Sequence, residues 1–349
     1  MVKIKTIIIH YILLIPIVTS CQMKKEIPEF HVEMSHPENK YRIEPVYDSI
    51  RTLENVSASF PYGGSSGEWG ESRKRWTEQH GTPIGAAITY YAVYEDAFYH
   101  LNVDFPIDTI KDWTKRYYPS SEVEENHEEL QEYIYDRKPA QKRTYIEFRD
   151  LVFGFAPKGM VVVWLRYGGT QKELGRYQAE VVEDDQALES KLFASWSMKR
   201  REVSKKYLIP DASPEKWDNY RIKYNWKPEI ISENKNFRLF WVLTEYFNAE
   251  YENKLRPMVV HPKVEKRAVP SLITFFWETG KGEKYEGRAF FDWKKTNELF
   301  KSVDDGNNEI QIKIEANNSD FEVLINNQPL EMVNKRVFKN DREFKESYK

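Results

Sequence analysis

The chain has 349 residues, of which 40% are hydrophobic and 15% aromatic, with 52 basic and 55 acidic side chains. This length suggests one large domain or two medium ones, and the aromatic share favours β structure because aromatic side chains fit a pleated, half-buried surface. A mildly acidic chain of mixed charge gives no electrostatic reason to expect a nucleic-acid partner.

Residues 1–20 have the pattern of a secretory signal peptide. A positively charged start precedes an apolar run at 6–18 and the two small residues Thr19 and Ser20, after which Cys21 follows. The apolar run is shorter than the roughly 20 residues that a transmembrane helix needs. It is therefore typical of a leader that is removed on export.

Cys21 is the single cysteine of the chain. The stretch Val18-Thr19-Ser20-Cys21 resembles the lipobox of bacterial lipoproteins, so we expect lipidation of Cys21, a tether over 21–30 and a membrane reached through the lipid. Gln22 at the next position resembles sorting signals that favour the outer membrane. The sequence does not distinguish the periplasmic face of that membrane from its surface face. With Cys21 acylated, no disulfide, thiolate zinc site or cysteine nucleophile is expected.

Residues 31–200 are predicted to be an N-terminal α+β half. β-Forming residues at 84–105 suggest two strands around Glu95-Asp96, and Pro106 suits the first turn of a helix. Turn residues then separate three strand-length runs that form an antiparallel meander. The predicted elements that follow residue 105 are helices at 106–117, 122–137 and 185–196 and strands at 144–155, 160–166 and 171–182.

Residues 201–235 are predicted to be a helical connector with a helix over 213–226. Ser213 suits the N-cap and Pro214 the first helical position. Pro228 ends the helix, because the residue before a proline avoids the helical region.

Four aromatic residues of this connector are the candidate binding residues. Trp217, Tyr220 and Tyr224 fall on one face of the predicted helix, and Trp226 follows them. They form either an exposed platform for a sugar or a peptide, or a stripe that packs into the core, which is the more common role of such spacing.

Residues 236–349 are predicted to be a C-terminal β-rich half. Ile310, Ile312 and Ile314 alternate with polar residues, as in a half-buried strand. The order strand–strand–helix–meander occurs at 84–182 and again at 271–332, which favours a duplicated unit over chance repetition. The fold class predicted is α+β, mainly antiparallel sheet with a few helices and two similar β-rich halves.

Three stretches in order carry a resemblance to a known family. They are Gly81-Thr-Pro-Ile-Gly-Ala-Ala-Ile-Thr-Tyr-Tyr with Glu95-Asp-Ala-Phe-Tyr, Trp164-Leu-Arg-Tyr-Gly-Gly-Thr with Gly175-Arg-Tyr-Gln-Ala, and Ile209-Pro with Trp217-Asp-Asn-Tyr and Tyr224-Asn-Trp226. Behind a lipobox, this order resembles the Bacteroidetes-type lipoproteins grouped as domain of unknown function 2931. The resemblance implies an exported lipoprotein and assigns no catalytic residue.

Local motifs do not assign chemistry. Ser65 lies in a G-x-S-x-G pattern, but polar residues follow it, which favours a surface loop. Glu95 and Asp96 are adjacent carboxylates. Adjacent residues of a strand point to opposite faces of the sheet, so the two could not act together there, and the corner of a hairpin is the favoured position. His127-Glu128 begins like a zinc-protease helix and lacks the second histidine. The sequence predicts no catalytic residue, no metal and no cofactor.

The expected function is a lipid-anchored cell-envelope protein that binds a protein or glycan partner, with a toxin-neutralising immunity role as one version. The alternative is a hydrolase that acts on envelope material. The chain has an acidic run at 122–136 and a basic run at 199–206. Three interpretations are open: each run binds a partner, each is a solvent-exposed helix face, or the two runs pair with each other. A cleft with perturbed carboxylates or histidines would favour the hydrolase.

Overall fold

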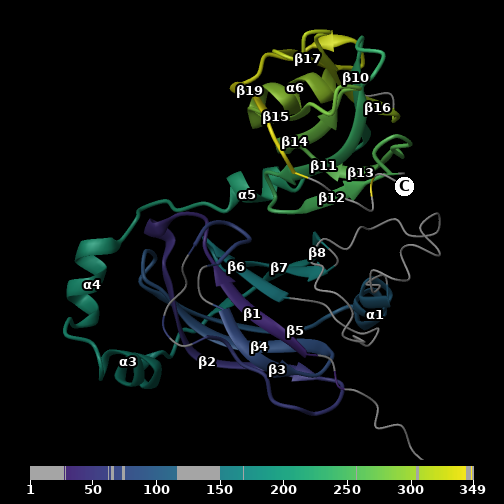
Figure 1. Ribbon diagram of the computed structural model, residues 1–349. Coiled ribbons are helices and arrows are strands. Elements are labelled where there is room, and N and C mark those ends of the chain that lie inside the picture. The colour runs from purple at the N-terminus through teal and green to yellow at the C-terminus, as the bar shows by residue number, and fades with distance from the viewer. Residues whose placement is uncertain are drawn as a thin grey trace, which may run out of the picture.

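The computed structural model shows an α+β protein dominated by antiparallel sheet, as the sequence predicts (Figure 1). It describes residues 27, 29–61, 63, 67–72, 75–115, 150–167, 169–256, 258–303, 306–342 and 347. Cys21, Ser65 and the acidic run at 122–136 lie outside the described residues. Among the helices that are described, none is long and apolar enough to cross a membrane.

The first half is a sandwich of two sheets. Alternate side chains of both sheets face inward and form one apolar core, which includes Val32, Ile88 and Phe153. One sheet contains β8 (Thr170–Gln178), β7 (Met160–Tyr167), β6 (Asp150–Ala156), β1 (Glu29–Ser35) and β3 (Arg75–His80), and the other β2 (Ile43–Thr52), β4 (Pro83–Ala92), β5 (Ala97–Asp104) and β9 (Glu180–Val181).

The helices of the first half lie outside its sheets (Figure 1). A short 3-10 helix, η1 (Asn39–Tyr41), joins β1 to β2, and α1 (Ile107–Lys115) follows β5, where the sequence predicts a helix. After β9 come α3 (Gln186–Phe193), α4 (Arg200–Tyr207) and α5 (Glu215–Tyr220).

The meander prediction is confirmed by β6, β7 and β8, which pair antiparallel in chain order. Their turns have the left-handed backbone that tight hairpins need. Lys158 and Gly159 have φ of 59° and 73°, and Gly169 has φ of 73°.

The second half is another two-sheet sandwich around its own core, which includes Trp226, Phe275 and Ile312. One sheet contains β12 (Tyr251–Leu255), β11 (Arg238–Tyr246), β14 (Pro270–Glu278), β15 (Lys284–Phe290) and β19 (Asn334–Lys339), and the other β13 (Glu265–Ala268), β10 (Lys223–Ser232), β16 (Asn308–Ile314), β17 (Phe321–Ile325) and β18 (Gln328–Pro329). The helix α6 (Trp293–Val303) joins β15 to β16.

The two halves repeat one strand order. In the first, the sheets run β8-β7-β6-β1-β3 and β2-β4-β5-β9; in the second, they run β18-β17-β16-β10-β13 and β11-β14-β15-β19. The strand directions also agree. The pair β1–β6 is parallel, as is its counterpart β10–β16, and the other strand pairs of the two copies are antiparallel. The repeat extends beyond the predicted 84–182 and 271–332, and β12 is an addition to the second copy.

The predicted connector is wrong in its second part. The helix expected over 213–226 ends at Tyr220, and Lys223–Ser232 is strand β10, paired with β16 in the core of the second half. Tyr224, Trp226 and Ile230 are buried at strand spacing. The second half therefore begins at residue 223 and not at 236.

The halves are joined edge to edge by one sheet. β8 of the first half pairs with β12 of the second through Gln171 and Tyr251, which makes a ten-stranded sheet. Figure 1 shows α5 at the boundary between the two sandwiches. The added strand β12 thus supplies the connection between the two copies.

Candidate functional site

The four predicted aromatic residues are mostly interior. Trp226 is fully buried, and its Nε1 donates to the carbonyl of Ala268 at 3.2 Å. Tyr224 is buried, stacks on Phe300 and donates its hydroxyl to Asn297 Oδ1 at 2.8 Å. With their polar groups bonded within the protein, these two residues cannot form the exposed platform.

Trp217 and Tyr220 belong to the contact between the halves. Trp217 is buried against the outer face of β6 and β7, where its ring lies 6.2 Å from that of Trp69. Tyr220 is half-buried and contacts Phe247 and Trp293 of the second half. The stripe interpretation is correct for both residues, since each packs inward.

The Glu95-Asp96 pair forms the corner of the β4–β5 hairpin, as the sequence favours. Burial raises the pKa of Glu95, whose carboxylate accepts from the backbone N–H of Lys158 at 2.9 Å. Asp96 instead binds Arg200 at 2.7 Å. The two carboxylates therefore serve different contacts.

The basic run at 199–206 forms α4, and its Arg200 is used within the protein. Its guanidinium contacts Asp96 and Asp185 at 2.7 Å each and Glu189 at 3.1 Å. These contacts fix α4 against the β4–β5 hairpin and α3.

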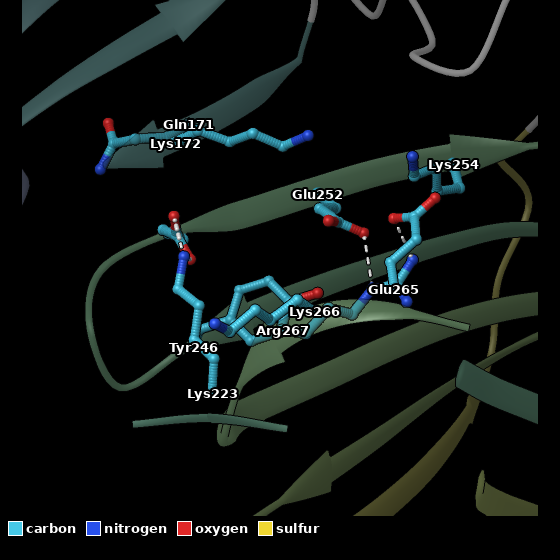
Figure 2. Close-up of a pocket in the computed structure, with 10 residues that line it drawn as sticks. Gln171, Lys172, Lys223, Tyr246, Glu252, Lys254, Glu265, Lys266 and Arg267 are labelled. Carbon is cyan, nitrogen blue, oxygen red and sulfur yellow. Dashed lines mark hydrogen bonds and ion pairs between the residues drawn. The ribbon is translucent and has the colours of Figure 1, made fainter. Parts of the chain in front are cut away.

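The best candidate site is a cavity of about 310 Å³ at the open edge of the second sandwich (Figure 2). β12 of one sheet and β13 of the other form its walls, and β8 of the first half closes one side. It is lined by Gln171, Lys172, Lys223, Tyr246, Glu250, Glu252, Lys254, Glu265, Lys266 and Arg267.

An ion-pair cluster spans the cavity between the two sheets. Arg267 of β13 binds Glu252 of β12 at 3.2 Å and Glu265 at 2.6 Å. It also donates to the carbonyl of Trp226 at 2.6 Å. Arg267 and Glu252 are buried, so their charges depend on this pairing rather than on water.

Glu252 remains ionised. Burial raises the pKa of its carboxyl, but the positive charges of Lys254, Arg267 and Lys172 together have the larger effect and lower that pKa to about 2. A general acid at neutral pH needs the opposite shift.

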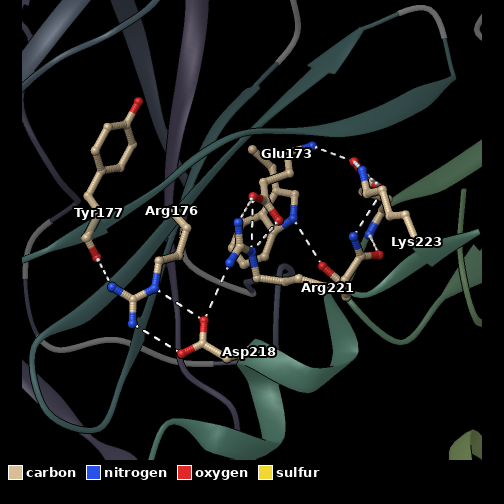
Figure 3. A network of polar contacts seen from close by, with 9 residues as sticks. Glu173, Arg176, Tyr177, Asp218, Arg221 and Lys223 are labelled. Carbon is tan, nitrogen blue, oxygen red and sulfur yellow. Dashed lines mark hydrogen bonds and ion pairs between the residues drawn. The ribbon is translucent and has the colours of Figure 1, made fainter. Parts of the chain in front are cut away.

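A second network fixes the side of the cavity that faces the first half (Figure 3). Glu250 binds Lys223 at 2.7 Å and accepts from the backbone N–H of Glu173 at 3.0 Å. The Glu173 carboxylate in turn binds Arg221 at 2.8 Å. The network joins β8, the residue after α5, β10 and the turn before β12, so it fixes β8 of the first half against this side of the cavity.

Tyr246 contributes a buried hydroxyl to the cavity. Its side chain is only 4% exposed, and among the described residues its hydroxyl has no hydrogen-bond partner. Burial raises its pKa well above the ordinary value, so the group remains a neutral donor. A buried hydroxyl without a partner is costly, and among the described residues the hydroxyls of Tyr90 and Tyr94 in the first core are in the same state.

These cavity residues are not identified by any local motif. They come from positions between 171 and 267 and meet only because β12 and β13 face each other and β8 pairs with β12. The sequence contains one indication of this site. Alternate positions that an ordinary sandwich fills with apolar residues are here charged, at Glu252 and Lys254 and at Glu265 and Arg267. Nothing in the described part of the chain groups three side chains able to hold a metal ion.

Comparison with known proteins gives one match. The family described as protein of unknown function (DUF2931) matches residues 22–211, more than half of the chain. No curated protein and no solved structure matches. The matched range ends before β10, so it covers the first copy of the repeated unit and not the second.

Proposed function

The chain belongs to the DUF2931 family, and from this premise we propose that it is a lipid-anchored envelope module that binds a protein or glycan partner. The observation that supports binding is the cavity at the junction of its two halves, since junctions of this kind are common ligand sites.

The charges in the cavity favour binding over hydrolysis. Glu252 and Glu265 are paired with Arg267, and Glu250 with Lys223. Glycoside hydrolysis uses one carboxyl of raised pKa as the acid and another as base or nucleophile. The pKa of the Glu252 carboxyl is shifted downward, which suits a group that accepts hydrogen bonds.

The anchor and the location are part of this proposal. The leader at 1–20 and the lipobox cysteine Cys21 support an acylated protein at the cell envelope, and Gln22 favours the outer membrane. The residues 21–30 would then separate the first sandwich from the bilayer. One acyl chain binds a membrane marginally and two or more bind stably.

The test is capture of envelope material by the whole chain in detergent, with one variant at the cavity and one matched control. Lys266→Trp fills the rim with a large ring, whereas Lys281→Trp makes the same change at the exposed β14–β15 turn at the other end of the strands. We expect capture by the wild type and Lys281→Trp, and at least tenfold less by Lys266→Trp. Equal capture by both variants would remove the cavity from the proposal, and no capture by the wild type would reject the binding role.

The hydrolase is tested at Ser65, which lies outside the described residues. Because polar residues follow it in the sequence, we expect Ser65→Ala to leave every phenotype unchanged. A fluorophosphonate probe that labels the wild type and not Ser65→Ala would show a reactive serine and support the hydrolase instead.

A further inference from the structure

We propose that the cavity between the halves binds a hydroxylated anion of monosaccharide size, that is, a sugar acid or a sugar phosphate. This inference rests on the proposed binding function and names the chemical class of the ligand. Two features of the cavity, its balance of charges and the hydroxyl of Tyr246, carry it.

The charge of the cavity favours an anion. Five basic side chains and three acidic ones line it. Lys172 and Lys254 lie near enough to Glu252 to lower its pKa, and in Figure 2 Lys172 extends from β8 across the cavity toward Lys254. Two ammonium groups on neighbouring strands of one sheet can both bind one carboxylate or phosphate by charge-assisted hydrogen bonds.

The acceptors of the cavity favour a ligand that also carries hydroxyl groups. Glu252 stays ionised, so it can only accept hydrogen bonds. Glu250 likewise presents a carboxylate at the cavity wall. A bare anion would be repelled by these carboxylates, whereas sugar hydroxyls donate to them while the anionic group lies among the lysines.

Tyr246 supplies the remaining donor. Its side chain lines the cavity, and its hydroxyl is buried without a partner among the described residues, so a ring or carboxylate oxygen of the ligand would accept from it once the atoms that cover it move. The volume of about 310 Å³ is at the lower end of small-molecule sites, which span about 300–1,000 Å³. A single sugar unit is therefore favoured over a long oligosaccharide.

The experiment is calorimetric titration of the whole chain in detergent with four probes. They are glucuronate, glucose 6-phosphate, glucose and acetate. We expect glucuronate, glucose 6-phosphate or both to bind at least tenfold more tightly than glucose and than acetate, because only they satisfy lysines and carboxylates together. The tighter of the two anions distinguishes a sugar acid from a sugar phosphate.

Three variants locate the binding. Lys172→Gln and Lys254→Gln should each weaken the anionic sugar about tenfold, and the control Lys281→Gln should not. Tyr246→Phe should also weaken it several-fold while the melting temperature stays equal or rises, because the change removes a buried hydroxyl that has no partner in the protein. A merely structural hydroxyl would instead lower the melting temperature and leave the affinity unchanged.

Two results would overturn the inference. One is that neither anionic sugar binds more tightly than glucose and acetate, and the other is no saturable binding of either anionic sugar. If envelope capture still depends on Lys266 in either case, only the ligand class is wrong and the binding function stands. If capture also fails, the proposed function fails with it.

Discussion

Each half buries one arginine among carboxylates. In the first, Arg166 binds Glu33 at 3.0 Å and Asp150 at 2.9 Å. In the second, Arg267 binds Glu252 across the cavity. Loss of one partner from such a cluster leaves a buried charge without compensation, which costs more than the pair itself contributes.

Glu252 gives the clearest pH dependence. Its folded pKa of about 2 lies below the ordinary value of 4.5, so its contribution is complete above about pH 5 and is lost as the pH falls toward 2. The shift corresponds to roughly 3 kcal/mol of unfolding free energy. We expect Glu252→Gln to be less stable than the wild type at pH 7 and to lose less stability on acidification, as measured by urea denaturation between pH 7 and 3.

The control for this prediction is Glu298→Gln, which changes an exposed glutamate of α6. It should follow the wild-type curve. If Glu252→Gln also follows that curve, the carboxylate is not held by the surrounding cations.

At the scale of the element, α5 has six residues and little intrinsic stability. It forms because Trp217 packs with Trp69 and Trp164 on the outer face of the first sheet. Its Asp218 also binds Arg176 of β8 at 3.1 Å. These contacts hold the helix on the first half, and its Tyr220 contacts Phe247 and Trp293 of the second.

Trp217→Ala should lower the melting temperature markedly. Removal of a buried tryptophan costs about 3–5 kcal/mol because apolar contacts are lost and a cavity remains. Trp217→Phe should recover part of that loss, and Tyr207→Ala, at an exposed position of α4, should change little. The measurement is thermal unfolding followed by circular dichroism. An unchanged melting temperature for Trp217→Ala would show that the contacts of Trp217 do not stabilise the fold.

At the scale of the whole molecule, the two copies differ in what covers the corresponding sheets. The outer face of the first, on β6 and β7, is covered by α5, and Trp164 donates to the carbonyl of Asn248 in the second half at 3.1 Å. The same face of the second copy carries ion pairs such as Lys227–Glu309 at 2.9 Å. A charged face does not favour burial against another domain, so a third unit is not expected to pack there in the same way.

The lipid anchor is the prediction that concerns the location of the whole protein. Cys21→Ala should block incorporation of a radiolabelled fatty acid and stop normal removal of the leader, because the acylated side chain would be absent. Membrane fractionation with the label is the measurement. A wild-type protein that takes up no label and remains in the soluble fraction would reject the anchor and the envelope location together.

The features that the sequence determined depend on neighbouring residues. The α+β class, the meander and its turns, α1 and the family resemblance all follow from local spacing, and the family match over 22–211 confirms the last of these. The Pro-Lys-Gly turn is readable from the sequence because its glycine supplies the positive φ that the turn needs, although Lys158 also adopts a positive φ of 59°.

The features that only tertiary structure decided depend on partners far along the chain. Two spacings of apolar residues overlap in this segment. A helix is indicated by the spacing of Trp217, Tyr220 and Tyr224, and a strand by that of Tyr224, Trp226 and Ile230. Pairing of β10 with β16 selects the strand beyond residue 222 because it satisfies the backbone and buries Trp226. The cavity depends on the same kind of contact, since its charged residues gather only when β12 joins the two copies of the repeated unit.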